Sequence, residues 1–351
     1  MGIVLARIEK VRLFILAACF LSLTACVSFP DAPPAIVTPH FSGETLISID
    51  GAALGLTAWN APGPKAVLVA VHGMNDYAHA FAGLGGWLSQ HENIAVYAYD
   101  QRGFGRSPDF GRWPGEETMI ADLSAAVAAA HAAHPGAPLF VLGHSMGAAV
   151  VMTAMREGPL DADGVILAAP GVWGGARLPI LYRVALNMSA SVLPGKSLTG
   201  ERAGRQATDN IEILREMFAD PLVIKETRLD AILGVVRLMG DGWDASNEIG
   251  GRILFLYGEK DDIIPVKAMA KTAERLCGDV ETRAYPDGWH LLFRDLQAEK
   301  VWSDVGAWID AQADAASPVS GSGPAASSCA GADGGRSVAF SATQRNDRSG
   351  V

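Results

Sequence analysis

The feature that most constrains the fold is a short apolar run that leads straight into a serine placed between two glycines. Residues 138–142 read PLFVL, a continuous apolar run that is typical of a parallel strand buried on both faces. Gly143, Ser145 and Gly147 follow, and residues 148–156 then have a helical pattern that ends at a Gly-Pro pair. A serine on such a strand–turn–helix junction presents its hydroxyl at the edge of a sheet, so Ser145 is a candidate nucleophile.

The Gly-x-Ser-x-Gly spacing alone is weak support for that role. The chain has 39 glycines among 351 residues, so the spacing can arise by chance. Serine is also a favoured residue at a helix N-cap, which would give Ser145 a purely structural role. The choice between these interpretations depends on whether a base and an acid lie where such a serine needs them.

Strands and helices alternate along most of the chain, which predicts an α/β fold. We expect strands at residues 45–50, 54–60, 66–71, 95–100, 138–143, 164–168, 252–257 and 280–285. We expect helices at residues 77–90, 117–134, 145–157, 266–276 and 298–311. The first two strands have the pattern of a hairpin, and the later strands, which helices separate, should be parallel. Residues 42–170 and 251–311 are therefore expected to form a mostly parallel eight-stranded sheet with helices on both faces and ligands at the carboxyl ends of its strands.

Residues 171–250 interrupt this alternation, because they contain helical patterns and no predicted strand. They are predicted to form a helical cap inserted after the sixth strand. Residues 179–193 and 228–239 are apolar at a helical spacing. Such helices either seat the cap on the core or line a tunnel for an acyl chain, and for the second role Leu186 and Leu233 are the candidate substrate-binding residues.

Residues 1–25 combine a basic stretch with an apolar stretch that is too short to span a bilayer, as a signal peptide does. The apolar stretch ends in Leu-Thr-Ala-Cys, which resembles the lipobox of bacterial lipoproteins, so Cys26 is the predicted site of lipid attachment. Residues 16–19 also fit the pattern but leave too short an apolar stretch. An ordinary secretory signal with an incidental cysteine is the alternative. Because Val27 rather than an aspartate follows, we expect the periplasmic face of the outer membrane of a Gram-negative cell.

Two further segments are expected to lie outside the folded core. Residues 26–41 contain four prolines and no helical periodicity, which predicts a semi-rigid tether of about 40 Å at about 3.1 Å per residue. Residues 312–351 are rich in Ala, Ser and Gly and are predicted to be a disordered tail. Cys277 is expected in a helix and Cys329 in this tail, so no structural disulfide is predicted.

The formal net charge of −10 argues against nucleic acid as a partner. It also argues against a polybasic signal for anionic lipid, so membrane attachment would rest on the acyl chains at Cys26. The cysteines have no metal-binding spacing, and neither a metal nor a cofactor is predicted. The sequence leaves the oligomeric state open.

A serine hydroxyl becomes an effective nucleophile only when a base accepts its proton and an acid orients that base. In the α/β-hydrolase chain order the acid follows the serine and the histidine comes last. His290, in YPDGWHLLFRD, is the only one of the eight histidines that follows Ser145. Asp261 is the candidate acid because it follows the seventh predicted strand with a Gly-x-x-Asp spacing, and the adjacent Asp262 is the alternative.

The oxyanion of a tetrahedral intermediate needs N–H donors that are fixed in advance. The backbone N–H of Met146, directly after the serine, is one candidate. The N–H of Met74, in the loop VAVHGMNDY after the third predicted strand, is the other. Gly73 permits close approach of the backbone there. His72 and His144 flank these positions and are interpreted as packing or hydrogen-bonding residues.

Five segments in order, VHGMNDY, YDQRGFGRS, GHSMGA, GEKDDIIP and DGWHLLFRD, resemble the monoacylglycerol lipase and lysophospholipase group of α/β-hydrolases, which is serine aminopeptidase S33-like. The resemblance runs from about residue 66 to residue 309. It is weaker in the cap, where DPLVIKETRL (residues 220–229) is also similar. It implies an α/β-hydrolase fold with Ser145 as nucleophile, Asp261 as acid and His290 as base.

The chain departs from the family pattern at three places, none of them in the triad. The loop after the third predicted strand has Asn75-Asp76 where Gly-Glu is usual, Phe104 replaces a common histidine, and Ala148 replaces a glycine. The first departure leaves specificity for the alcohol side of the substrate open.

The resemblance implies a serine hydrolase that cleaves carboxylic esters of single-acyl lipids, monoacylglycerol or lysophospholipid, through an acyl-enzyme. Two alternatives remain on the same fold. The triad could transfer the acyl group to another acceptor, or hydrolyse a non-lipid ester or amide. The protein could also be an inactive lipid-binding lipoprotein, although the complete triad argues against that reading.

Overall fold

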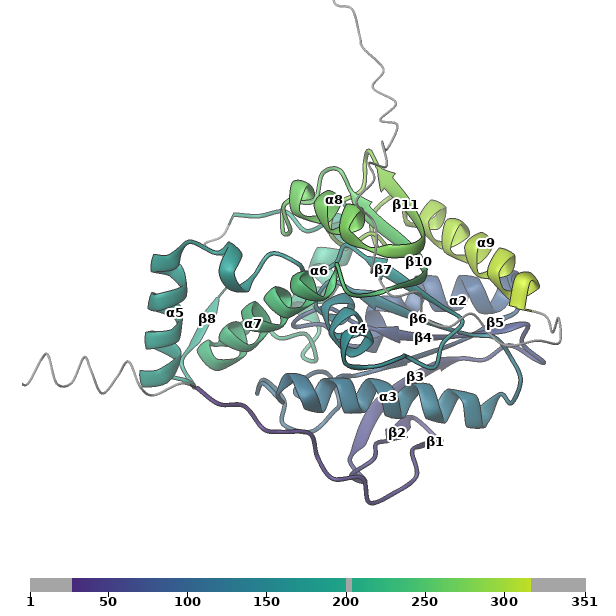
Figure 1. Cartoon of the computed structure of the whole chain (residues 1–351), viewed down its shortest axis with the longest axis horizontal. Coiled ribbons are helices and arrows are strands. Elements are labelled where there is room, and N and C mark those ends of the chain that lie inside the picture. Colours follow the sequence, from purple (N-terminus) through teal and green to yellow (C-terminus); the bar gives the residue numbers. More distant parts are fainter. Residues whose placement is uncertain (1–26, 200–203, 317–351) are drawn as a thin grey trace, which may run out of the picture.

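The computed structural model describes residues 27–199 and 204–316 (Figure 1). The predicted signal peptide, Cys26 and most of the predicted tail lie outside these described residues, so their state remains a prediction.

A nine-stranded sheet in the order β1-β2-β3-β5-β4-β6-β7-β10-β11 forms the centre of the molecule (Figure 1). Its strands are β1 (His40–Ser42), β2 (Thr45–Ile47), β3 (Ala53–Trp59), β4 (Ala66–Val71), β5 (Ile94–Tyr99), β6 (Leu139–His144), β7 (Gly164–Ala168), β10 (Gly250–Gly258) and β11 (Cys277–Tyr285). Pairing is antiparallel from β1 to β5 and parallel between all the other neighbours. Every residue of β4, β5, β6 and β7 is buried, as it must be in strands covered on both faces.

The helices of the core cover both faces of this sheet. They are the 3₁₀ helix η1 (Ala78–Phe81) and the α-helices α2 (Ala82–His91), α3 (Glu116–Ala133), α4 (Met146–Glu157), α8 (Val266–Arg275) and α9 (Ala298–Ala316). Helix α2 packs closely against α9, because the ring of Trp302 occupies the space that a side chain at Gly83 would need. Helices α3 and α4 pack against each other on the near face in Figure 1.

The prediction of a mostly parallel sheet with helices around it is confirmed, and the differences lie at the ends of elements. The sheet has nine strands rather than eight, because β1 is too short to show alternation in sequence. The helix expected from residue 77 begins as the 3₁₀ helix η1. The helix expected to reach residue 276 stops at Arg275, and Cys277 opens β11. Helix α9 continues to Ala316, five residues into the predicted tail.

The segment expected to form the cap lies between β7 and β10. It contains the 3₁₀ helix η2 (Gly175–Arg177) and the helices α5 (Ile180–Val192), α6 (Ile211–Ala219) and α7 (Leu229–Ala245). Helix α7 lies against α4 of the core and against the ring of Trp113, which leaves no room for a side chain at Gly234.

The prediction that this segment contains no strand is wrong. Two short strands, β8 (Ser197–Thr199) and β9 (Glu226–Arg228), pair antiparallel and form a separate two-stranded sheet. Each has only three residues, and so short a run has no period for a sequence pattern to show.

The N-terminal segment, residues 27–38, is docked on the molecule and does not extend from it as the predicted semi-rigid tether would. The half-buried ring of Phe29 meets Trp113 edge-on at 6.2 Å and lies under the guanidinium of Arg237 at 5.5 Å. Arg237 also donates a hydrogen bond of 2.7 Å from Nη1 to the carbonyl oxygen of Val27. Phe29 therefore bridges the cap helix α7 and the core.

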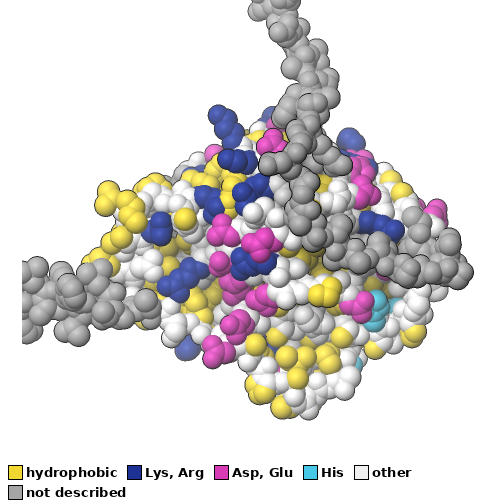
Figure 2. All heavy atoms as spheres, in the orientation of Figure 1, with side chains coloured by type: hydrophobic (Ala, Val, Ile, Leu, Met, Phe, Trp, Pro, Cys, Tyr) yellow, Lys and Arg dark blue, Asp and Glu magenta, His cyan; other side chains and the backbone are white. Residues whose placement is uncertain are grey.

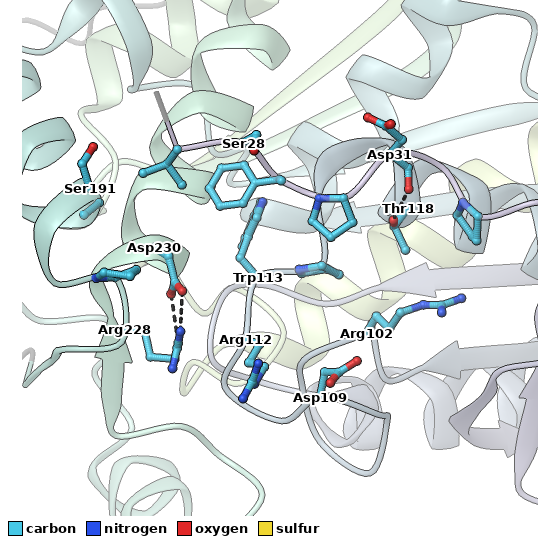
Figure 3. A pocket seen from close by; sticks show the side chains of 17 residues that line it. Ser28, Asp31, Arg102, Asp109, Arg112, Trp113, Thr118, Ser191, Arg228 and Asp230 are labelled. Atoms are coloured by element: carbon cyan, nitrogen blue, oxygen red, sulfur yellow. Dashed lines mark hydrogen bonds and ion pairs between the residues drawn. The ribbon is translucent and has the colours of Figure 1, made fainter. Parts of the chain in front are cut away.

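Hydrogen bonds between side chains of α3 and the backbone of the segment continue this docking along the first turn of α3. The hydroxyl of Thr118 donates to the carbonyl of Asp31 at 3.3 Å, and the N–H of Ala32 donates to the Glu117 carboxylate at 3.0 Å. The segment forms one wall of a cavity of about 590 Å³ between cap and core (Figure 3). Composition predicts an extended segment here. It cannot predict that the ring of Phe29 packs between α7 and Trp113.

Cys277 takes part in a disulfide bond, which contradicts the expectation of no structural disulfide. The expectation failed because it placed Cys277 inside a helix, whereas the residue begins the edge strand β11 beside Gly250.

None of the helices in residues 27–199 and 204–316 is both long and apolar enough to cross a bilayer.

Candidate active site

Ser145 lies on a sharp turn between β6 and α4. Its backbone has φ 53° and ψ −115°, a strained conformation for a residue with a side chain. Two glycines make the turn possible. A Cβ at Gly147 would lie 2.2 Å from the carbonyl oxygen of Val71, and a Cβ at Gly143 would lie 2.5 Å from the Cα of Ala148. The expected strand–turn–helix junction is therefore present, with the helix beginning at Met146.

The structure brings Ser145, His290 and Asp261 into one chain of hydrogen bonds. His290 Nε2 lies 2.9 Å from Ser145 Oγ, and His290 Nδ1 lies 2.8 Å from Asp261 Oδ2. The backbone N–H groups of Ile263 and Ile264 donate to the other carboxylate oxygen at 2.8 and 2.9 Å. The acid, the base and the serine come from three loops at the carboxyl edge of the sheet.

The charges and hydrogen bonds of these three residues determine which of their atoms carry protons. Burial raises the pKa of Asp261, but the charge and hydrogen bond of His290 and the two backbone N–H groups outweigh it and lower that pKa overall. Ionised Asp261 can only accept, so Nδ1 of His290 carries the proton. Nε2 is then the acceptor for the Ser145 hydroxyl, which is the arrangement a general base needs.

The adjacent carboxylate, Asp262, has a different place. It is exposed and accepts a hydrogen bond of 3.1 Å from the backbone N–H of Gln206. Of the two alternatives for the acid, the geometry therefore favours Asp261.

The loop after β4 passes directly beside the nucleophile. A Cβ at Gly73 would lie 3.2 Å from Ser145 Cβ, so the N–H of Met74 is close to the reacting centre. Met146 is the first residue of α4, where backbone N–H groups have no partner within the helix. The structure therefore brings Met74 and Met146 close to Ser145, and their role as the two oxyanion donors stays a prediction.

The two other histidines near the site hold backbone in place. His144 donates from Nε2 to the carbonyl oxygen of His290 at 2.9 Å. Burial, with the nearby His290, lowers the pKa of His144 to about 3, so its ring stays neutral. His72 donates from Nδ1 to the Gly73 carbonyl at 2.8 Å and accepts the N–H of Gln101 at 2.9 Å. Both rings have the packing and hydrogen-bonding roles expected of them.

A buried ion pair joins the loops that carry Met74 and His290, and sequence reasoning missed it. The guanidinium of Arg294 contacts the carboxylate of Asp76, and the two side chains are 12% and 8% exposed. The segment DGWHLLFRD contained Arg294, but no sequence signal connected it to Asp76, which lies 218 residues earlier.

The two leucines expected to bind substrate lie where the cap helices meet the N-terminal segment. Leu233 is buried in a small apolar cluster with Ala190 and Leu229, and Leu186 is partly buried and packs against it, as do Val27 and Phe29. These contacts fit the expected role of seating the cap. A role for Leu186 and Leu233 in binding an acyl chain stays a prediction. Among the residues that the structure describes, no three His, Cys, Asp or Glu side chains are grouped so that they could hold a metal ion.

Comparison with known proteins gives one matching family and several relatives. The model of the serine aminopeptidase S33 family (Hydrolase_4) matches residues 62–297. A monoacylglycerol lipase of Mycolicibacterium smegmatis is 28% identical over 290 residues, which cover 78% of this chain and 99% of that protein. The human monoglyceride lipase is 25% identical over 307 residues, covering 82% of this chain and 96% of the human protein.

Solved structures show the same fold. The monoacylglycerol lipase of Paleococcus ferrophilus superposes with a TM-score of 0.63 at 21% identity, covering 74% of this chain and 99% of that one. A soluble variant of the monoglyceride lipase of Saccharomyces cerevisiae, in complex with a substrate analogue, superposes with a TM-score of 0.64 at 19% identity, covering 82% and 99%.

Proposed function

We propose, on the premise that the chain belongs to the serine aminopeptidase S33 family of α/β-hydrolases, that it hydrolyses carboxylic esters of single-acyl lipids through an acyl-enzyme on Ser145. The observation that carries the chemistry is the hydrogen-bond chain from Ser145 through His290 to buried Asp261. The substrate class rests on the relatives that match along most of their length, which are named monoacylglycerol and monoglyceride lipases.

In the first half of the reaction Ser145 Oγ attacks the ester carbonyl while its proton moves to Nε2 of His290. Asp261 stabilises the imidazolium that results, and the N–H groups of Met74 and Met146 receive the oxyanion. When the tetrahedral intermediate collapses, the C–O bond to the alcohol breaks. The alcohol leaves with the proton from His290, and the acyl group stays on Ser145.

In the second half, His290 removes a proton from water, which attacks the acyl-enzyme through a second oxyanion. Collapse releases the fatty acid and returns the proton to Ser145. Acyl transfer would differ only in the acceptor, since an alcohol would take the place of water. No feature of the described site favours such an acceptor over water.

We further propose that the protein is anchored to a membrane through Cys26, with the cap helix α5 facing the lipid. Six of the thirteen residues of α5 are large apolar residues with strongly exposed side chains: Ile180, Leu181, Tyr182, Val184, Met188 and Val192. Figure 2 shows apolar side chains over α5 at the left edge of the molecule. The described part of the N-terminal segment begins at the same cap, since Val27 packs against the cluster between α5 and α7.

The proposed chemistry is tested with Ser145→Ala. This variant should lose ester hydrolysis and labelling by a fluorophosphonate while its circular dichroism is unchanged. His290→Ala should cost nearly as much activity, because the members of a triad act as a unit. Ser124→Ala, on the exposed side of α3, is the matched control and should behave as the wild type. Retention of most activity in Ser145→Ala would overturn the mechanism.

The proposed substrate class is tested with p-nitrophenyl esters from acetyl to dodecanoyl. Each buried methylene contributes about 0.8 kcal/mol, so kcat/KM should rise with chain length over the medium range. Specificity constants that stay flat or fall from acetyl to dodecanoyl would contradict a lipid ester as substrate, even if the serine chemistry were correct.

A further inference from the structure

The loop that carries Met74 is bonded to the cap as well as to the core. Asn75 donates a hydrogen bond of 2.7 Å from its side-chain amide to the hydroxyl of Thr227. The N–H of Ile224 donates to the backbone carbonyl of Asn75 at 2.9 Å. The hydroxyl of Tyr77 donates to the carboxylate of Asp220 at 2.7 Å. Three hydrogen bonds thus join this loop to residues 220–228, the cap segment between α6 and α7.

The side chain of Asn75 makes this link possible in a position where the backbone is restricted. Asn75 has φ 66°, in the left-handed region that asparagine tolerates better than most residues. A glycine, which is usual here in the family that the sequence resembles, would satisfy the backbone but could not reach Thr227. Rotating the amide would let the hydroxyl of Thr227 donate instead, so the pair does not depend on which amide atom faces it.

The cap side of the link is itself held in place. Thr227 lies in β9 and pairs with Leu198 of β8. The carboxylate of Asp220 also accepts the N–H of Leu222 at 2.8 Å, and Lys225 donates to the carbonyl of Val223 at 2.7 Å. A movement of the cap would therefore move Thr227, and Asn75 with it.

On the core side, hydrogen bonds and an ion pair hold the loop in addition to the packing of Gly73 and Met74 against the core. His72 and the ion pair between Asp76 and Arg294 fix it at two places. A cavity of about 280 Å³ borders the loop, lined by Asp76, Tyr77, Asp220 and Arg294 among others. Because the loop borders this cavity directly after Asn75, the hydrogen bonds of Asn75 and Tyr77 to the cap are restraints that the core does not supply there.

We propose that the hydrogen bond between Asn75 and Thr227 makes the cap a positioning element for the oxyanion hole. The position of the cap determines the position of the loop, and with it the position of the Met74 N–H. The two residues are positioning residues, because they act on the reaction through Met74. A displacement of about 1 Å in such a group can cost up to about 100-fold in rate, so loss of one restraint is expected to cost less than that. This inference rests on the proposed hydrolysis at Ser145.

The test uses p-nitrophenyl acetate, whose acyl group is too short to reach far into the cap. Thr227→Val removes the hydroxyl at nearly constant volume and should lower kcat by about 3- to 10-fold with little change in KM. Thr227→Ser should restore kcat. Thr199→Val removes an exposed hydroxyl from the partner strand β8, makes no change at the loop, and is the matched control that should behave as the wild type.

A second variant protects the test against a general effect on the cap. Asn75→Gly keeps the left-handed backbone and should cause the same fall in kcat, and the double variant should be no worse than either single one, since both remove the same bond. An unchanged kcat in Thr227→Val and Asn75→Gly would overturn the coupling. Its failure is distinct from failure of the proposed function, in which the wild type itself would neither hydrolyse the ester nor react with a fluorophosphonate.

Discussion

At the scale of single residues, Asp261 and Asp262 show how little sequence distance separates a buried acid from a surface carboxylate. Asp261 turns inward and receives two backbone N–H groups together with His290. Asp262, one residue later, lies in solvent. The hydrogen bonds that lower the pKa of Asp261 are also those that orient it toward the imidazole.

This pair gives a matched prediction. Asp261→Asn should lower kcat by about three to four orders of magnitude, because an amide can present an N–H to Nδ1 and no longer fixes the tautomer that activates Ser145. Asp262→Asn, of the same size and charge change, should leave kcat within about twofold of the wild type. The measurement is steady-state kinetics on a soluble ester, and equal losses in the two variants would refute the assignment of Asp261.

Chain order and local motifs were sufficient to predict which residues form the triad. Ser145, Asp261 and His290 each follow a recognisable strand, and parallel strands bring their carboxyl ends to one edge. The side chains that support them could not be predicted in this way. Asn75 meets Thr227 across 152 residues, and nothing in either local sequence specifies the contact.

At the scale of elements, the predictions succeeded where a strand is long and buried on both faces, as in β4 to β7. They failed for β1, β8 and β9, whose three residues carry no periodicity. They also failed for the N-terminal segment, because docking of Phe29 depends on a groove that α7 and Trp113 form only in the folded protein.

The contact between α3 and α7 gives a prediction for pH dependence. Burial, with the charge of Asp241 on α7 nearby, raises the pKa of Glu116 at the start of α3 from 4.5 to about 7. Burial also raises the pKa of Asp241, while Arg156 opposes both shifts. Between pH 4.5 and about pH 7, the folded protein therefore binds more protons than the unfolded chain. Its free energy of unfolding should fall as the pH rises through that window.

We expect Glu116→Gln to remove this dependence. The difference in Tm between pH 5.5 and pH 8 should be more positive in the wild type than in the variant by a few degrees. Glu299→Gln, an exposed carboxylate on α9, is the control and should leave the difference unchanged. Identical pH profiles in wild type and Glu116→Gln would show that these carboxyls do not share a proton in the folded protein.

At the scale of the whole molecule, the docked N-terminal segment changes what a lipid anchor at Cys26 would do. A free tether of about 40 Å would let the enzyme turn in any direction relative to the membrane. Val27 instead packs between α5 and α7, and Arg237 binds its carbonyl oxygen. An anchor one residue earlier would therefore hold the cap close to the lipid surface, and α5 lies beside the point where the described N-terminal segment begins (Figure 1).

The apolar side of α5 should then bind lipid even without the anchor, which can be measured on Cys26→Ser protein. Leu181 is 78% exposed, so Leu181→Ser should leave the fold and the hydrolysis of a soluble acetyl ester unchanged. It should weaken co-sedimentation with phosphatidylcholine vesicles by about tenfold, because each large apolar side chain that enters the interface contributes about 1.5 kcal/mol. Ile36→Ser is the matched control, since Ile36 is 70% exposed but lies beside β2, bonded to Ile49 and away from α5. If both substitutions weakened vesicle binding equally, or neither did, α5 would not be the face that meets the membrane, and the orientation imposed by the docked segment would have to be abandoned.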